Sequence, residues 1–277
     1  MIREITIKVL VYMINILKIE RKIYSLSNKA FLSSLSIKTT ADKYILQERI
    51  IKLKKIILNN LVPVENLKRY GAKNDGGYVL YSGFSPLTTV ISCGIGDNAS
   101  FDFDVADEVS EVYMYDHTID SVEKLKTNMQ FFKLGIDIKS IENFITIKEI
   151  TNKYRLHNII LKLDIEGMEW DILDNLSDEL LLIFDQVAVE FHNLFQLAQI
   201  EKFNLYIRVL EKMSKYFSVI NIHPNNWGGS RIVCGVPLAD TFEITFLSKQ
   251  VQSIPLKSKI DLNNPNNPNE PELRYIF

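Results

Sequence analysis

The sequence predicts an α/β fold built around a largely parallel sheet, and three observations lead to it. From the strand VISC (90–93) onward, short apolar runs alternate with segments of helical periodicity, as in strands joined by crossover helices. The run NIILKLDI (158–165) is apolar almost throughout before Asp164, as expected of a strand buried on both faces. The first strand leads into two closely spaced glycines, Gly94 and Gly96, which outline a ligand-binding turn.

Seven strands and the helices between them follow from this pattern. The strands are expected at 90–93, 111–116, 131–136, 158–165, 186–192, 217–223 and 241–248. Helices are expected at about 98–109, 119–129, 169–176 and 196–216. Because no long helix separates the last two strands, we expect them to form an antiparallel pair at one edge of the sheet.

The segments on either side of the sheet divide the chain into three parts. Residues 1–60 read as helical, since apolar residues recur at helical spacing through 39–60. The Asp-Gly-Gly at 75–77 indicates a hairpin-type turn between two extended segments at the start of the main domain, 61–250. The tail at 251–277 is rich in Asn and Pro and is expected to be an extended strap or a disordered end.

Composition limits the class of protein. The 277 residues are 47% hydrophobic and 24% charged, which is typical of a globular chain with one sizeable core. A net charge of −2 gives no basic footprint, so nucleic acid is not an expected partner. Cys93 and Cys234 both lie in apolar contexts, which favours buried free thiols and a reducing, cytoplasmic compartment.

The N-terminal segment EITIKVLVYMINILKIERK (4–22) is strongly apolar. Lys8 and Lys18 bound an uncharged run that is shorter than the roughly 20 residues a membrane-spanning helix needs. No small-residue cleavage site follows it, so it does not read as a signal peptide. One interpretation is a helix that packs on the main domain or on a second copy of the chain. The other, more specific interpretation is a helix that contacts the inner membrane face peripherally.

The glycine turn fits two cofactors. With Ala99, the spacing satisfies the dinucleotide fingerprint G-x-G-x-x-G/A, and Asp116 ends the second strand, where it can bind a ribose that NAD and S-adenosylmethionine share. Asp97 separates the two, because a carboxylate after the second glycine would repel a pyrophosphate and favour a sulfonium and an ammonium. An ordinary helix N-cap is the alternative interpretation of Asp97.

Polar pairs at a spacing of two close three of the expected strands. They are Asp164 and Glu166, Glu190 and His192, and Asn221 and His223. Each pair shares one face of its strand, and neighbouring strand ends lie close enough to act on one ligand. Carboxylates with an imidazole suit proton transfer or a divalent metal, although any one of them alone is equally explained as solvated strand-end polarity. Trp227, in HPNNWGGS at the same edge, could wall a substrate pocket or anchor its loop.

Several of these segments resemble a known family. VISCGIGDNASFD, YDHT, LKLDIEGMEWDIL, VAVEFH and GVPLADTFEITFLSK, with KNDGGYVL upstream, are similar to the FkbM-type and methyltransferase-like-24 group of S-adenosylmethionine-dependent methyltransferases. The resemblance covers about residues 65–250, and LKLDIEGMEW after a glycine turn is its most specific part. It implies a class I methyltransferase (Rossmann-like) sheet of seven strands in the order 3-2-1-4-5-7-6, the seventh antiparallel, with 1–60 as an N-terminal helical extension.

The resemblance also implies the cofactor site. Gly94 and Gly96 would lie beside the methionine part of S-adenosylmethionine, Asp116 on its ribose, and Asp164 near the sulfonium and the substrate. The full set of expected cofactor-binding residues is Asp75, Gly76, Gly77, Gly94, Gly96, Asp97, Asp116 and Asp164.

The favoured function is methyl transfer to a sugar hydroxyl of a nucleotide-activated or glycoconjugate substrate, such as a capsule or surface polysaccharide. Related sugar O-methyltransferases often use Mg²⁺ or Mn²⁺, and Asp164, Glu190 and His192 are the expected metal ligands or catalytic groups. His223 is the candidate base if His192 binds the metal. The alternatives are an NAD-dependent sugar oxidoreductase or epimerase, which lacks a Tyr-x-x-x-Lys pair here, and a non-catalytic interaction protein tethered through 4–22.

Overall fold

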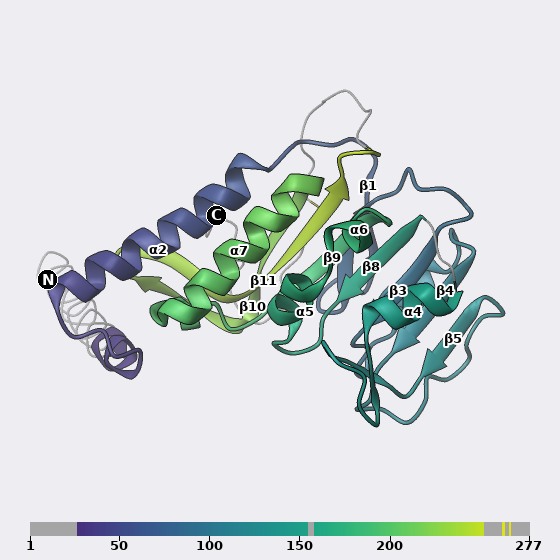
Figure 1. The fold of residues 1–277 in the computed structure, drawn as a ribbon, viewed down its shortest axis with the longest axis horizontal. Helices are drawn as coiled ribbons and strands as arrows, with labels where there is room; N and C mark the ends of the chain where they lie inside the picture. The colour runs from purple at the N-terminus through teal and green to yellow at the C-terminus, as the bar shows by residue number, and fades with distance from the viewer. Residues whose placement is uncertain (1–26, 155–157, 252–261, 264–265, 267–277) are drawn as a thin grey trace, which may run out of the picture.

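The computed structural model describes residues 27–154, 158–251, 262–263 and 266 (Figure 1). The apolar segment 4–22 and nearly all of the expected tail lie outside the described residues, so the interpretations that concern them stay predictions. No helix in the described part of the chain is long and apolar enough to cross a membrane.

Within the described residues, the main sheet has seven strands. They are β3 (Thr89–Cys93), β4 (Glu111–Tyr115), β5 (Met129–Phe132), β8 (Ile159–Leu163), β9 (Phe184–Phe191), β10 (Phe217–Val233) and β11 (Val236–Ser248). Their spatial order is β10-β11-β9-β8-β3-β4-β5, with β11 antiparallel to both of its neighbours and the other pairs parallel. Counted along the chain within this sheet, the order reads 3-2-1-4-5-7-6, which is the order that the family resemblance implies.

Helices and smaller strand pairs surround this sheet. The helices are α2 (Thr40–Asn59), α3 (Ser100–Val105), α4 (Ile147–Tyr154), α5 (Glu169–Asn175), α6 (Asp178–Leu181), the 3-10 turn η1 (Leu194–Ala198) and α7 (Ile200–Tyr216). The strand pairs are β1 (Leu67–Gly71) with β2 (Gly77–Tyr81), and β6 (Gly135–Ile136) with β7 (Phe144–Ile145). Figure 1 shows α2 and α7 side by side over the end of the sheet that β10 and β11 form.

The helix α2, which belongs to the described part of the N-terminal extension, packs into the main core. α2 begins with a capping box, in which Thr39 accepts from the Asp42 N–H and Asp42 accepts from the Thr39 N–H. Its buried side chains are Leu46, Ile50, Leu53 and Ile57, which recur at helical spacing and pack into the core cluster on one face of the sheet. The expected helix at 39–60 is therefore confirmed.

The hairpin β1–β2 covers the other face of the sheet and carries the expected turn at 75–77. It is fixed to the sheet by polar contacts: Gln186 and Tyr81 exchange two hydrogen bonds of 2.9 and 2.8 Å, and the Thr245 hydroxyl donates to the Val79 carbonyl at 2.6 Å. Because these contacts are buried, they hold the turn at a defined place beside the strand ends.

Three expected elements are wrong in detail. No helix forms at 119–129, because Lys124 adopts a φ of +57°, a left-handed conformation that interrupts a helix. The third strand occupies Met129–Phe132, while Gly135 and Ile136 pair with β7 in a separate sheet instead of extending it. The sixth strand was expected to end at 223, whereas β10 continues to Val233 as a long hairpin with β11. The helix α4 was not expected from the sequence.

Candidate active site

A cavity of about 630 Å³ lies at the carboxyl ends of β3, β4 and β8. Most of the predicted site residues line it: Asp75, Gly76, Gly94, Gly96, Asp97, Asp116, Asp164, Glu190 and His192. Two predicted residues, Gly77 and His223, do not. The position agrees with the general rule that ligands of open α/β sheets bind beyond the carboxyl ends of the strands.

The two glycines of the turn differ in what a side chain at their position would contact. Gly94 has a φ of +82°, and a Cβ there would lie 1.6 Å from the backbone oxygen of Asp164 at the end of β8. Gly96 also has a positive φ, +57°, but a Cβ there would meet nothing within 4 Å. Gly94 is therefore required by close packing of two strand ends, whereas Gly96 borders open space in the cavity.

Asp116 closes the glycine turn. Its Oδ2 accepts from the N–H groups of Ile95 and Gly96, both at 2.8 Å, and its Oδ1 accepts from the N–H and the hydroxyl of Thr118 at 2.7 and 2.6 Å. Burial alone would raise the pKa of Asp116, but these hydrogen bonds outweigh it and lower the pKa to about 2. The carboxylate thus shapes the turn, and the ribose contact implied by the resemblance stays a prediction.

Replacing Asp116 with asparagine is expected to lower the free energy of unfolding by about 1–2 kcal/mol at pH 7, since one acceptor oxygen and the charge are lost. The folded-state pKa lies below the ordinary 3.8, so the stabilisation is present above pH 4 and disappears as the pH falls toward 2. Urea unfolding of both proteins at pH 7 and pH 3 measures the difference. A gap that stays the same or widens at low pH would contradict this explanation.

Asp97 is not a helix N-cap. α3 starts at Ser100, and its N-cap is Ala99, which makes no side-chain hydrogen bond to the helix. Asp97 is instead exposed and lines the cavity. The alternative interpretation of this residue as a helix N-cap is therefore wrong.

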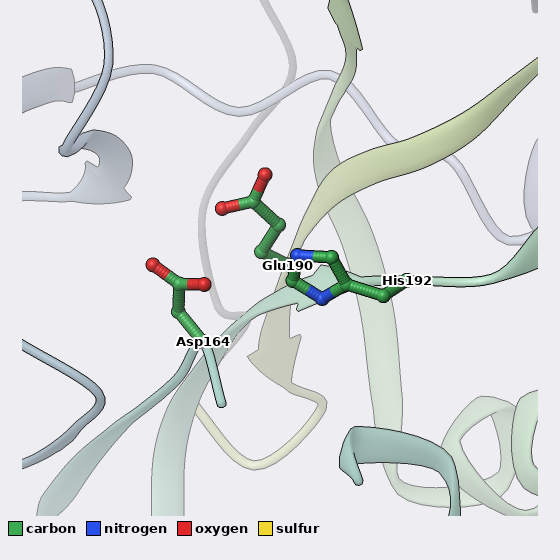
Figure 2. A group of neighbouring side chains, drawn as sticks. All are labelled: Asp164, Glu190 and His192. Atoms are coloured by element: carbon green, nitrogen blue, oxygen red, sulfur yellow. The ribbon is translucent and has the colours of Figure 1, made fainter. Parts of the chain in front are cut away.

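Asp164, Glu190 and His192 meet at the ends of β8 and β9 (Figure 2). One ligand atom from each lies within 4.8 Å of those of the other two. The Tyr78 hydroxyl, from the hairpin, donates to Asp164 Oδ2 at 2.6 Å and lies 3.4 Å from Glu190 Oε2. The predicted cluster therefore forms, with a tyrosine between its two carboxyl groups.

The pKa values of the two carboxyl groups of the cluster shift in opposite directions. Burial alone would raise the pKa of Asp164, but the Lys162 ammonium, 3.3 Å away, and the Tyr78 hydroxyl outweigh it and hold that pKa below the ordinary value. Burial raises the pKa of Glu190 well above its ordinary value, and the negative charge of Asp164 adds to this effect. The surroundings thus favour the charged form of Asp164 and disfavour the charged form of Glu190.

The imidazole of His192 lies between acids. Its Nδ1 is 3.0 Å from Glu169 Oε1, and its Nε2 is 3.5 Å from Glu166 Oε2. Burial alone would lower the pKa of His192, but the hydrogen bond and charge of Glu169 outweigh it and raise that pKa.

His223 does not join the cluster. It lies on β10 opposite Glu243 of β11, at the edge of the sheet, and its buried Nε2 is 2.8 Å from Asn266 Oδ1. Gly77 belongs to β2, where a Cβ would lie 2.2 Å from the Ala72 carbonyl oxygen, so its packing lies within the hairpin and not toward the cavity. The structure therefore does not place either residue in the roles expected for them.

Three contributors to the site were missed from the sequence: Tyr78, Lys162 and Glu169. Lys162 carried a signal, since a lysine inside an otherwise apolar buried strand needs a partner, and it finds the Gly94 carbonyl and Asp164. Tyr78 and Glu169 lie in the segments KNDGGYVL and LKLDIEGMEW, but their roles depend on how the hairpin and α5 dock.

No protein-family model and no curated protein matches the chain. Among solved structures, a Streptococcus mutans protein named as a methyltransferase and solved with SAH is similar at 14% identity over 60% of this chain and 88% of its own, with a TM-score of 0.33. Fibrillarin, in its complex with Nop5p, is similar at 14% identity over 59% and 72%, with a TM-score of 0.35. A protein named as a hemolysin from Streptococcus thermophilus is similar at 14% identity over 72% and 65%, with a TM-score of 0.35. At such low scores these likenesses carry no argument, and the resemblance to FkbM-type proteins stays a prediction.

Proposed function

We propose that the protein is an S-adenosylmethionine-dependent methyltransferase that transfers a methyl group to a sugar hydroxyl. The observation that carries this proposal is the cavity beside the glycine turn of β3, whose walls are strongly acidic. Within the described part of the chain, its lining holds seven carboxyl side chains: Asp75, Asp97, Asp102, Asp116, Asp164, Glu166 and Glu190.

The charge of the cavity favours this cofactor over NAD. The one lysine of the described lining, Lys162, is already bonded to the Gly94 carbonyl and lies beside Asp164. Apart from Lys162, the described lining offers a pyrophosphate no lysine or arginine to balance Asp97 and the other acids. α3 begins at Ser100 and has Asp102 in its first turn, which further disfavours a phosphate there. The sulfonium and ammonium of S-adenosylmethionine suit the same surroundings.

The cluster of Asp164, Glu190 and His192 fits a divalent ion such as Mg²⁺ or Mn²⁺. Carboxylate oxygens with one imidazole nitrogen are a donor set that these ions accept, and the donor atoms lie within 4.8 Å of one another. A bound ion would polarise a substrate hydroxyl and make it easier to deprotonate.

The chain's own residues contribute charge and orientation. Lys162 and the Tyr78 hydroxyl keep Asp164 ionised, so this carboxylate can hold a hydroxyl or an ion in one orientation. Asn225 donates to Glu190 Oε1 and fixes the second acid. The hydroxyl must lose a proton while its oxygen, the methyl carbon and the sulfur stand in line, and His192 is the group that we assign to accept that proton when no ion occupies its nitrogen.

Trp227 supports a sugar as the acceptor. Trp227 lines the cavity although it is 61% exposed, and its backbone N–H donates to Asn225 Oδ1 at 2.7 Å beside an irregularity in β10. An exposed aromatic face held at a polar cavity can stack on the C–H face of a sugar ring. The acidic walls favour an acceptor whose phosphates, if it has any, stay outside the cavity.

Replacing Trp227 with alanine is expected to raise the KM for the acceptor about three- to tenfold, while Trp227→Phe keeps most of the affinity, since stacking is worth about 0.5–1.5 kcal/mol. Binding of S-adenosylhomocysteine should not change in either variant. Steady-state kinetics and calorimetry on the same preparations measure the two quantities. An unchanged KM in Trp227→Ala would exclude the stacking role.

The function is tested by release of S-adenosylhomocysteine from S-adenosylmethionine in the presence of Mg²⁺ or Mn²⁺. The acceptor panel contains neutral glycosides, oligosaccharides and nucleotide-activated sugars, and a reaction without acceptor is the blank. Turnover with a carbohydrate and loss of one acceptor hydroxyl in the product supports the proposal. Turnover only with non-carbohydrate hydroxyl or amine compounds would overturn the sugar assignment.

A further inference from the structure

We infer that Glu169 is a positioning residue that fixes the imidazole of His192 with Nδ1 as the donor and Nε2 presented to the cluster. The inference rests on the proposed function for its catalytic meaning, but the geometry stands by itself. Glu169 is fully buried and begins α5, directly after the loop that follows Asp164.

The hydrogen bonds of Glu169 converge on one oxygen. Its Oε1 accepts from the N–H of Ile165 at 3.0 Å and from the N–H of Gly167 at 3.1 Å, and it lies 3.0 Å from His192 Nδ1. The next residue, Trp170, donates from its indole N–H to the backbone oxygen of His192 at 3.0 Å. Two consecutive residues of α5 thus hold the ring and the backbone of His192.

This arrangement determines the tautomer. An oxygen that already accepts two backbone N–H groups meets His192 as an acceptor, whatever the charge of the carboxyl group, so Nδ1 must be the donor. In the neutral ring the lone pair is then on Nε2, the nitrogen available to an ion or to a hydroxyl proton. A partner of this kind on the far nitrogen is what orients metal-binding histidines in general.

Glu169 also shapes the loop between β8 and α5, where Glu166 and Gly167 adopt positive φ values of +61° and +119°. A purely structural role would be limited to this loop and would leave the ring of His192 free to adopt either tautomer. A positioning role and a purely structural role of Glu169 therefore predict different tautomers of His192, and the tautomer can be measured without catalysis.

The test is long-range ¹H–¹⁵N NMR of the histidine rings of the full chain, recorded above the titration of the ring, with His192 assigned from a His192→Gln variant. In the wild type we expect protonated Nδ1 and unprotonated Nε2. Glu169→Gln retains an acceptor oxygen and should keep this tautomer, whereas Glu169→Ala should show a mixture. The control is Glu166→Gln, whose exposed side chain contacts the other nitrogen and should not change the tautomer.

A second readout is the affinity for Mn²⁺, measured by electron paramagnetic resonance. Glu169→Ala is expected to bind Mn²⁺ about 10- to 100-fold more weakly, and Glu169→Gln within about threefold of wild type. Protonated Nε2 in the wild type overturns the inference even if Glu169→Ala does not fold, and so does an unchanged tautomer in a folded Glu169→Ala. If the wild type binds no Mn²⁺, the metal part of the proposed function fails, and the tautomer still decides the role of Glu169.

Discussion

The double variant Glu190→Ala, His192→Ala is expected to lose methyl transfer by at least about 1,000-fold while it still binds S-adenosylhomocysteine nearly as well as the wild type. The two side chains lie at the end of β9 and meet Asp164 within 4.8 Å. In the proposed function, the acceptor hydroxyl is oriented and deprotonated beside this cluster. Losing an orienting or ion-binding group together with a proton acceptor removes contributions that act mainly in the transition state.

The measurement is turnover and calorimetric binding on the same preparation. Glu179→Ala, an exposed acid on α6, is the matched control and should leave both unchanged. Near-wild-type turnover in the double variant would show that the cluster is not the reacting centre. Loss of S-adenosylhomocysteine binding together with turnover would show instead that these side chains hold the cofactor.

Gly94→Ala is expected to destabilise the protein by about 3–5 kcal/mol and to abolish cofactor binding. A Cβ at this position would lie 1.6 Å from the Asp164 carbonyl oxygen, so the ends of β3 and β8 must separate. Gly96→Ala is the matched control, because it has the same kind of positive φ but no atom within 4 Å of the added carbon. Its cost should be only about 1–2 kcal/mol, from the left-handed backbone.

Thermal or urea unfolding of the two glycine variants separates packing from backbone strain. Equal destabilisation of Gly94→Ala and Gly96→Ala would mean that the close approach of the two strand ends is not what fixes this turn. A fully stable Gly94→Ala would contradict the geometry of the turn itself.

Most of the main sheet could be predicted because its signals are local. Nearly continuous apolar runs such as Ile159–Leu163 specify buried strands, and the absence of a helix before β11 indicates the antiparallel pair. The helix expected at 119–129 failed because helical spacing alone did not reveal that Lys124 would take a left-handed backbone. The length of β10 was predicted wrongly because β10 and β11 continue to pair beyond the residues of β11 that pair with β9. The length of such a hairpin depends on both strands together and cannot be predicted from either one alone.

The candidate site was predictable where strand ends carry polar residues, as at Asp164, Glu190 and His192. The same reasoning failed for His223. This histidine lies on β10, and β11 separates β10 from β9, so His223 does not line the cavity. Asp116 shows another limit. Its position at the strand end was predictable, but its bonds to Ile95, Gly96 and Thr118 depend on the loop conformation.

The central claim is that the acidic cavity beside the glycine turn binds S-adenosylmethionine. Isothermal titration calorimetry of the full chain with S-adenosylmethionine, S-adenosylhomocysteine and NAD tests it most directly. We expect submillimolar binding of the first two, lost in Gly94→Ala, and no binding of NAD. Submillimolar binding of NAD with none of S-adenosylmethionine would contradict the account and favour the oxidoreductase or epimerase alternative.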